Sequence, residues 1–509
     1  MLLDISAGIR VNRSKDVTMS RQFQLLSAFA AFAALYPLSQ CHAAVPDLNA
    51  RDRDGYTALM RAAAGGRADD VKALIAAKAD VNATARGGYT ALMRAGAVGS
   101  ADCVKALIGA HAHLNATATG GYTALMMAVY NGHADCAGAL IDAHADLNAT
   151  DKDGRTALMR AAAVGRADCV KDLIDAHAHL NATARNGCTA VMFAAEKGDM
   201  DGLKNLIAAK ADVNARANHG WTALIFAASK GHADCVEALS NAHADLNATD
   251  NLGYTALMMT AALGDVDCVK ALIDAHAHLN ATAKHGYTAL MDAAYHRHAD
   301  CVKALLDAHS DPNVVDEFGR TALVLAVEKG SADCIKALVD GGAEVNGSSK
   351  NGVTALMDAA YTGHADCIKA LIAAGADVNA GSNFGVTALV YAAEKGDVPC
   401  VKALIAAGAD VNVNSGGGTA VDKAALLGHA ACVKALIAAG ADVNIKDEFG
   451  STPLIGAAWA CDTESVKALI AAGADVNVVD DLHNTALRWA TEHHSSACIR
   501  ALKAAGARR

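Results

Sequence analysis

A threonine returns at one fixed interval along almost the whole chain. Twelve of the thirteen intervals are equal, and the remaining one is shorter by a single residue. The threonines are Thr57, Thr90, Thr123, Thr156, Thr189, Thr222, Thr255, Thr288, Thr321, Thr354, Thr387, Thr419, Thr452 and Thr485. A period of about 33 residues is typical of stacked-repeat proteins, in which each unit buries its apolar face against its neighbours. We therefore expect one array of about fourteen similar units, which leaves no stretch for a separate catalytic domain.

The unit around Thr354 predicts two short helices between turns. Thr354 can cap a helix whose apolar face is formed by Leu356, Ala359 and Ala360, because these positions recur on one side of an α-helix. Gly363 ends this helix. A second apolar face follows between residues 367 and 372, and a further glycine closes the unit. The unit is therefore expected to be turn, helix, loop and helix.

This repeat resembles that of the ankyrin family. The chain repeats Gly-x-Thr-Ala-Leu-Met-x-Ala-Ala, then Gly-His-Ala-Asp-Cys, then Gly-Ala-Asp-Val-Asn, over about residues 47–509. The resemblance implies an all-α fold, an ankyrin-repeat solenoid of stacked helix-turn-helix units joined by β-turn loops. Proline follows the threonine only at Pro453, and the family's histidine after the leucine is never present. We therefore expect cohesion between repeats to depend more on apolar packing.

The composition limits the classes of partner. Hydrophobic residues make up 53% of the chain but aromatic residues only 4%, so the core is expected to consist mainly of Ala, Leu, Val and Ile. The net charge of −10 argues against nonspecific binding of nucleic acid, which requires a basic surface. We expect another protein as the partner, no membrane span, no cofactor and a monomeric chain.

The amino terminus differs from the repeats. After a short basic start at Met19, an apolar stretch covers residues 25–38, and small residues precede a cleavage point after Ala43. The sequence predicts an N-terminal extension with a signal peptide over 1–43, the repeat array over 44–509, and a periplasmic or secreted protein. Two alternatives are a hydrophobic helix that caps the first repeat and a lipid anchor on Cys41, although Gln40 stands where a lipoprotein signal has a small residue.

Eleven of the fourteen cysteines share one position on the inner face of the second helix. They are Cys103, Cys136, Cys169, Cys235, Cys268, Cys301, Cys334, Cys367, Cys400, Cys432 and Cys498. Stacked helices lie about 8–10 Å apart, beyond the roughly 7 Å that a disulfide can bridge between Cα atoms. We expect small buried hydrophobic side chains without disulfides. Many unpaired thiols are unusual in an exported protein, so a cytoplasmic location is the alternative.

Histidine replaces the glycine that closes the second helix in six repeats, at His111, His144, His177, His243, His276 and His309. Three of them belong to His-x-His pairs, which could hold zinc or copper between adjacent repeats. The simpler interpretation is that histidine tolerates the left-handed conformation of this turn. The histidine and cysteine ladders together give the alternative function, a metal-sequestering or redox-buffering protein.

Aromatic side chains recur at the turns and on the first helices, outside the expected core positions. In the ankyrin family these positions face a concave groove and contact partners, and aromatic residues are favoured as binding anchors. The predicted partner-binding residues are Tyr56, Arg61, Tyr89, Arg94, Tyr122, Arg160, Phe193, Trp221, Phe226, Tyr254, Met259, Tyr287 and Tyr391. Packing of the same side chains on neighbouring repeats is the alternative.

The residue four positions after the threonine changes in character along the expected groove. It is arginine in early repeats, phenylalanine or methionine in the middle, and aspartate at Asp292 and Asp358. A partner with an acidic stretch followed by an apolar one would suit this order, and exchange of Phe193 and Phe226 for alanine is expected to leave the fold intact. The sequence therefore predicts a non-enzymatic protein-protein interaction scaffold that binds through the concave groove and the turn tips.

Overall fold

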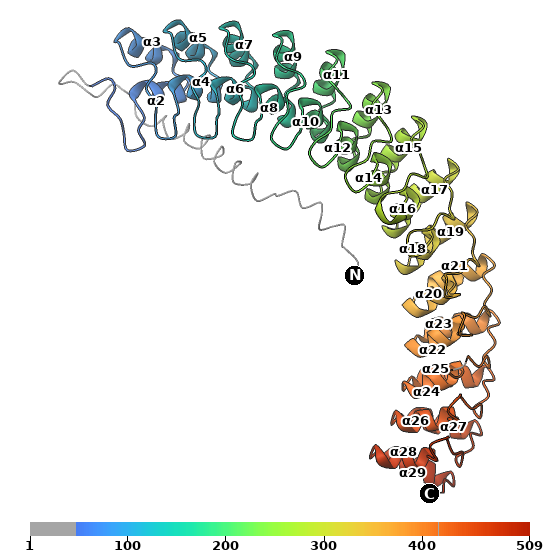
Figure 1. The fold of residues 1–509 in the computed structure, drawn as a ribbon. Helices are drawn as coiled ribbons and strands as arrows, with labels where there is room; N and C mark the ends of the chain where they lie inside the picture. Colours follow the sequence, from blue (N-terminus) through green and yellow to red (C-terminus); the bar gives the residue numbers. More distant parts are fainter. Residues whose placement is uncertain (1–46, 416, 509) are drawn as a thin grey trace. The chain divides into compact units, whose positions relative to one another are not determined.

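The computed structural model describes residues 47–415 and 417–508. The predicted signal peptide, the boundary after Ala43 and Cys41 lie outside the described residues. The chain divides into two compact units, Met1–Asn251 and Leu252–Arg509, which are called the N-terminal unit and the C-terminal unit. Each is an all-α solenoid of helix pairs, as the sequence predicts (Figure 1).

The described part of the N-terminal unit contains six helix pairs. The first helices are α2 (Ala58–Ala64), α4 (Ala91–Val98), α6 (Ala124–Asn131), α8 (Ala157–Val164), α10 (Ala190–Lys197) and α12 (Ala223–Lys230). The second helices are α3 (Ala68–Ala76), α5 (Ala101–Gly109), α7 (Ala134–Asp142), α9 (Ala167–Asp175), α11 (Met200–Ala208) and α13 (Ala233–Asn241). Successive first helices pack on one another, and so do successive second helices.

The described part of the C-terminal unit contains eight pairs with the same packing. The first helices are α14 (Ala256–Leu263), α16 (Ala289–Tyr295), α18 (Ala322–Glu328), α20 (Ala355–Thr362), α22 (Ala388–Lys395), α24 (Ala420–Leu426), α26 (Pro453–Trp459) and α28 (Ala486–Glu492). The second helices are α15 (Val266–Asp274), α17 (Ala299–Asp307), α19 (Ala332–Asp340), α21 (Ala365–Ala373), α23 (Val398–Ala406), α25 (Ala430–Ala438), α27 (Thr463–Ala471) and α29 (Ser496–Ala504). One 3-10 turn, η4 (Lys284–Gly286), precedes α16.

The periodic threonine caps the first helix. In eleven repeats its hydroxyl accepts a hydrogen bond from the backbone N–H three residues later, as between Thr57 and Met60 at 3.3 Å. Thr189, Thr387 and Thr452 make no such bond. An N-terminal cap satisfies one of the backbone donors that a helix leaves unpaired, which explains why the threonine recurs.

The core lies between the two helix layers of each repeat. The leucine two residues after the threonine is buried, and so are the cysteine and the branched residue that follows it on the second helix, as in Leu356, Cys367 and Ile368. All eleven cysteines of the ladder are buried, and none of the thirteen described cysteines forms a disulfide with another of them. The expected role as small buried hydrophobic residues is confirmed for the described ladder.

The turn after the second helix also follows the sequence interpretation. His111, His144, His177, His243, His276 and His309 have φ between 59° and 68°, in the left-handed region. Later repeats place glycine at the equivalent position, for example Gly375 with φ of 84°. The histidines therefore occupy positions that the backbone geometry reserves for residues able to adopt positive φ.

Polar bonds between repeats come from a residue other than the histidine that the family uses. The side-chain oxygen of the asparagine at the end of one repeat accepts a hydrogen bond from a backbone N–H in the following repeat, as Asn148 does from His179 at 2.9 Å. The same bond recurs in both units, at 2.7–2.9 Å. This asparagine ladder accompanies the apolar packing that was expected to dominate.

Candidate partner-binding surface

Three of the thirteen predicted binding residues are buried. The exposed fractions are 8% for Arg94, 2% for Arg160 and 5% for Phe193. The expectation that all first-helix positions four residues after the threonine face outward is therefore wrong. These side chains contact residues of the turns instead, as Arg94 does with Tyr56 and Tyr89, Arg160 with Asp151, and Phe193 with Arg155.

Arg160 of α8 lies in a closed polar contact. Its Nε donates to Oδ2 of Asp151 at 2.8 Å, and its guanidinium donates to the hydroxyl of Tyr122 in the preceding repeat at 3.0 Å. The other carboxylate oxygen of Asp151 accepts the backbone N–H groups of Asp153 and Arg155, which fixes the turn. Arg160 and Tyr122 thus join two repeats, and the charge of Arg160 is neutralised within the N-terminal unit.

Arg94 of α4 is held by two tyrosines. Its guanidinium carbon lies 4.8 Å from the ring centroid of Tyr56 and 4.3 Å from that of Tyr89, and the guanidinium donates a hydrogen bond to the Tyr56 hydroxyl. Burial lowers the pKa of Arg94 to about 10. Arg61 is exposed, but its Nε donates to Asp52 at 3.0 Å. The predicted basic stretch for an acidic partner is therefore wrong for Arg94 and Arg160.

Phe193 of α10 corrects the expectation that no aromatic residue lies in the core. Its ring is buried, and the guanidinium of Arg155 lies 5.1 Å from its centroid. Asp292 of α16 is likewise buried rather than part of an outward acidic surface. Exchange of a buried phenylalanine for alanine costs about 3–5 kcal/mol, so such a change at Phe193 would damage the fold that it was expected to preserve.

Trp221 and Phe226 remain at the surface of the N-terminal unit. Trp221 lies in the turn before α12 and Phe226 on the helix itself, and both are half-buried. Their ring centroids are 5.0 Å apart in an edge-to-face arrangement. This geometry is favourable for aromatic rings and holds them in one orientation before any partner arrives.

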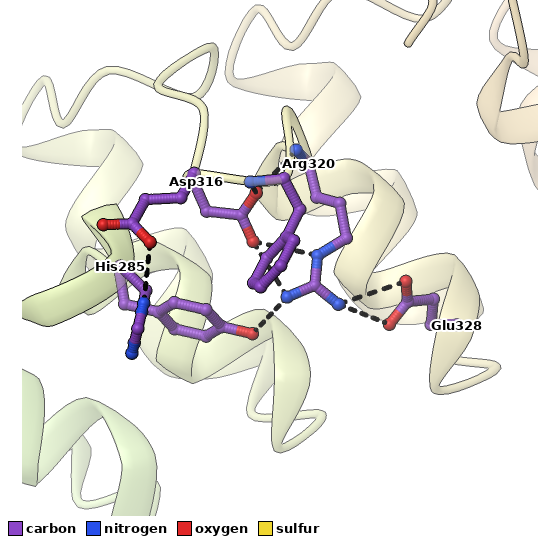
Figure 2. A network of polar contacts seen from close by, with 7 residues as sticks. His285, Asp316, Arg320 and Glu328 are labelled. Carbon is purple, nitrogen blue, oxygen red and sulfur yellow. Dashed lines mark hydrogen bonds and ion pairs between the residues drawn. The ribbon is translucent and has the colours of Figure 1, made fainter. Parts of the chain in front are cut away.

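In the C-terminal unit, Tyr287 links two repeats through Arg320, whose polar contacts Figure 2 shows. Its hydroxyl accepts a hydrogen bond from Arg320 at 2.9 Å, and Arg320 also donates to Asp316 at 2.8 Å and to Glu328 at 3.4 Å. The position before the capping threonine thus serves cohesion at Tyr287, as it does at Tyr56 and Tyr122. For these three tyrosines, packing on neighbouring repeats is the interpretation that the contacts support.

Tyr391 of α22 lies beside Tyr361, with ring centroids 5.9 Å apart in an edge-to-face arrangement. Tyr361 is exposed, and the ammonium nitrogen of Lys395 lies 3.9 Å from its ring centroid. Tyr254 and Met259 are half-buried. Burial, and secondarily the charge of Glu328, raises the pKa of Asp358 to about 6. A second aromatic surface pair thus lies on the first helices, near a carboxylate that resists ionisation.

The family model described as ankyrin repeats (3 copies) matches residues 29–118, 92–184, 166–250, 242–316, 300–382, 379–447 and 424–508. These matches cover most of the chain. The chain is a member of the ankyrin repeat family. Among solved structures, it is similar to the crystal structure of the human ASB11 ankyrin repeat domain, at 26% identity and a TM-score of 0.40. That match covers 44% of this chain and 100% of the other. A comparison with curated proteins finds no match.

Ankyrin repeats are in general protein-protein interaction modules. The described turns of this ankyrin array carry one feature that the predicted site set omitted, a group of exposed apolar residues at the turn tips of the C-terminal unit. Their exposed fractions are 52% for Leu252, 69% for Phe318, 76% for Phe384, 64% for Phe449 and 73% for Leu482. Binding through the turn tips is predicted from the sequence, and the position that these residues share, three before the threonine, places them at the tips.

The alternative based on metal or thiol chemistry gains no support from the ankyrin array. Among residues 47–415 and 417–508, no three His, Cys, Asp or Glu side chains are grouped so as to hold a metal ion. Burial raises the pKa of several ladder thiols, to about 11 for Cys136 and Cys367 and about 12 for Cys400, which suppresses the reactive thiolate. In the same residues no helix is both long and apolar enough to cross a bilayer.

Proposed function

We propose that this ankyrin array is a non-enzymatic scaffold that binds another protein through its turns and first helices. The observation that carries the proposal is the pair of surface aromatic contacts, Trp221 with Phe226 and Tyr361 with Tyr391. The core of the array is almost entirely aliphatic, so these rings are not required to fill it. They supply large, already oriented apolar area on the face that ankyrin repeats generally use for partners.

The energetic argument concerns conformational entropy. An aromatic side chain has two rotatable bonds, so it loses little freedom when it is buried at an interface. The edge-to-face contact between Trp221 and Phe226 removes part of that freedom beforehand. Binding at such a pair therefore gains apolar burial at a low ordering cost.

A non-enzymatic role is supported by the chemistry of the described side chains. The most abundant candidate nucleophiles are the ladder thiols, which are buried. Burial raises the pKa of Cys169 to about 11, which keeps this thiol protonated at neutral pH. The arginines that contact tyrosines, such as Arg160 with Tyr122 and Arg320 with Tyr287, form hydrogen bonds that link neighbouring repeats. Surface complementarity is thus the mechanism that the molecule offers.

The test is affinity capture with the full chain and the variant Trp221→Ala/Phe226→Ala. We expect the variant to retain its helical circular dichroism and to lose specifically retained proteins. Phe193→Ala serves as a control for damage to the core, since its loss of binding should accompany a lowered unfolding midpoint. Retention of the same proteins by the folded double variant would contradict the proposal for this pair.

We further propose that the array is exported after cleavage behind Ala43. Support comes from the basic start, the apolar stretch over 25–38 and the small residues before the cleavage point. The burial of the ladder cysteines removes the objection that an exported protein would oxidise them. Sequencing of the mature amino terminus tests this. A terminus at Ala44 is expected, and an intact start in the cytoplasm would exclude export.

A further inference from the structure

Five exposed apolar side chains occupy one repeat position in the C-terminal unit: Leu252, Phe318, Phe384, Phe449 and Leu482. The four most exposed, Phe318, Phe384, Phe449 and Leu482, are called the tip residues. Each lies three residues before the periodic threonine. Single exposed apolar residues are common on proteins and need no explanation. Five of them at the same structural position in one unit are a different observation, because the array places them along one edge.

The turn holds each tip residue in a fixed backbone conformation. The backbone N–H of Phe318 donates to Asp316 at 2.9 Å, and that of Phe449 donates to Asp447 at 2.9 Å. The backbone N–H of Leu482 donates to Asp480 at 3.0 Å, and that of Phe384 donates to the hydroxyl of Ser382 at 3.3 Å. The following residue has positive φ in all four turns, between 59° and 77°. The apolar side chains are therefore presented from rigid turns rather than from flexible loops.

The turn itself does not require an apolar residue. In the N-terminal unit the equivalent positions are Asp54, Gly87, Gly120, Asp153, Asn186 and His219. These residues form tight turns with the same periodic threonine, and Asn218 donates its backbone N–H to the carbonyl of Asn186 at 3.0 Å. The turn therefore forms without phenylalanine at the tip. Its exposure has a cost in solubility that a contact with a partner would offset.

The spacing of the tip residues specifies the length of the partner. Phe384 lies two repeats after Phe318, and Phe449 lies two repeats after Phe384. Packed helices lie about 8–10 Å apart, which places successive phenylalanines roughly 16–20 Å apart. An extended chain covers that distance in about 5–6 residues, at roughly 3.3 Å per residue.

Carboxylates accompany the tip residues. Exposed Glu317, Glu448 and Asp481 immediately precede Phe318, Phe449 and Leu482. The guanidinium carbon of Arg320 lies 5.2 Å from the ring centroid of Phe318, but this arginine is already paired with Asp316 and Glu328. Oε2 of Glu317 lies 2.7 Å from Nδ1 of His285, which belongs to the preceding turn (Figure 2). The tips therefore combine apolar rings with an excess of negative charge.

We propose that the tip residues of the C-terminal unit dock a basic, apolar protein segment, with apolar side chains about 16–20 Å apart and lysine or arginine between them. This inference rests on the proposed function and specifies its partner. The phenylalanine rings take up the apolar side chains, and Glu317, Glu448 and Asp481 pair with the cations. The same carboxylates repel an anionic lipid surface, which disfavours a membrane as the occupant.

The experiment is selection of a phage-displayed library of random peptides on the full chain. Each peptide has about 20 residues, the number in roughly six helical turns. Enriched peptides are then measured against Phe318→Asn/Phe384→Asn/Phe449→Asn, which copies the residue at Asn186. Because the N-terminal unit tolerates asparagine at this position, the triple variant is expected to keep its helicity and unfolding midpoint. A second variant, Glu317→Gln/Glu448→Gln/Asp481→Asn, tests the charge, and Trp221→Ala/Phe226→Ala separates the two surfaces.

We expect enriched peptides that combine lysine or arginine with apolar residues about six positions apart. Their affinity should fall at least tenfold on the triple variant and several-fold on the charge variant, with a weaker dependence on salt in the latter. Peptides that bind the triple variant with unchanged affinity but no longer bind Trp221→Ala/Phe226→Ala would overturn the docking proposal. That result would leave the proposed function standing. Enrichment of no peptide counts against both.

Two other occupants have their own readouts. Sedimentation of the full chain with vesicles of phosphatidylcholine and phosphatidylglycerol, abolished in the triple variant, would overturn the proposal in favour of a membrane. A concentration-dependent dimer in analytical ultracentrifugation that the triple variant loses would overturn it in favour of a second copy. A monomeric chain that does not sediment with the vesicles supports a basic, apolar protein segment as the occupant.

Discussion

Arg160 and Asp151 form an ion pair that is almost wholly withdrawn from water, with exposed side-chain fractions of 3% and 1%. The pair joins a first helix to the turn nine residues earlier, and the hydroxyl of Tyr122 extends it to the preceding repeat. That preceding repeat carries Ala118 and Met127 at the two equivalent positions. The array therefore contains both an ionic and an apolar version of the same packing site.

Removal of one partner should destabilise the N-terminal unit strongly. Arg160→Met leaves the buried carboxylate of Asp151 without its cation, and such a loss costs about 3–5 kcal/mol. Urea unfolding followed by hydrogen exchange of peptides over 122–175 measures it, because a repeat array need not unfold in a single step.

The matched control is the double variant Asp151→Ala/Arg160→Met, which copies the preceding repeat. Because both charges are gone and the array already contains the apolar version, we expect most of the lost stability to return. Equal destabilisation in the single and double variants would mean that the arginine acts through packing of its stem and not through the ion pair.

The repetitive features of the fold could be predicted from residue type alone. A threonine before each first helix, cysteines on the buried side and histidines at positive φ each depend on local geometry, which recurs once in every repeat. Position within the repeat then fixes the environment. These features therefore follow from the sequence without knowledge of the side-chain contacts.

The environment of Arg94, Arg160 and Phe193 could not be predicted in this way. Their position four residues after the threonine is buried at Arg160 but exposed at Arg61. Tyr122 and Asp151 enclose Arg160, whereas Arg61 belongs to the first described repeat. Burial at this position is decided by residues 9 and 38 positions away, so a rule based on one repeat cannot assign it.

The left-handed histidines offer a stabilising change. The combined variant His144→Gly/His177→Gly/His243→Gly places glycine where these residues have φ of 62°, 63° and 59°. Later repeats already have glycine there, and an added Cβ at Gly375 or Gly408 meets nothing within 4 Å. We expect a gain of roughly 0.5 kcal/mol per site, because glycine adopts positive φ without the steric cost of a side chain. The measurement is the urea midpoint.

His133 provides the control for the same exchange. It precedes α7 with φ of −96°, and its Nε2 lies 3.2 Å from the carbonyl oxygen of Ala97 in the preceding repeat. His133→Gly should lower the midpoint by losing this contact, in contrast to the other three changes. A loss of stability in the triple variant would instead show that those side chains contribute interactions that outweigh the backbone strain.

The cysteine ladder should be unreactive in the native protein. Burial raises the pKa of Cys301 and Cys432 to about 11, so at pH 8 roughly one thiol in a thousand is ionised, and the side chains are also enclosed. Titration with a thiol reagent at pH 8 should label only half-buried Cys461 among the described cysteines. Labelling of the whole ladder is expected after unfolding in guanidinium. Rapid native reaction at Cys301 or Cys432 would contradict the buried assignment.

Asp358 should make the C-terminal unit less stable as the pH rises. Its folded-state pKa is raised from 3.8 to about 6, first by burial and then by the charge of Glu328. A carboxyl whose pKa is higher in the folded state contributes stability that is fully present below its unfolded pKa and is lost as the pH rises through about 6. The affected window therefore lies between about pH 4 and pH 6.

Asp358→Asn isolates this effect. The side chain makes no cap that the fold requires, since Thr362 bonds to the backbone carbonyl of Asp358 and not to its carboxylate. At pH 7.5 the variant should be more stable than the parent by about 1–3 kcal/mol, and the difference should vanish near pH 4. Asp366→Asn in the same repeat removes an exposed carboxylate with the same change of charge. The stability of this variant should therefore stay close to that of the parent at pH 7.5 and at pH 4. A constant gain from Asp358→Asn across the whole range would refute ionisation of this carboxyl as the cause.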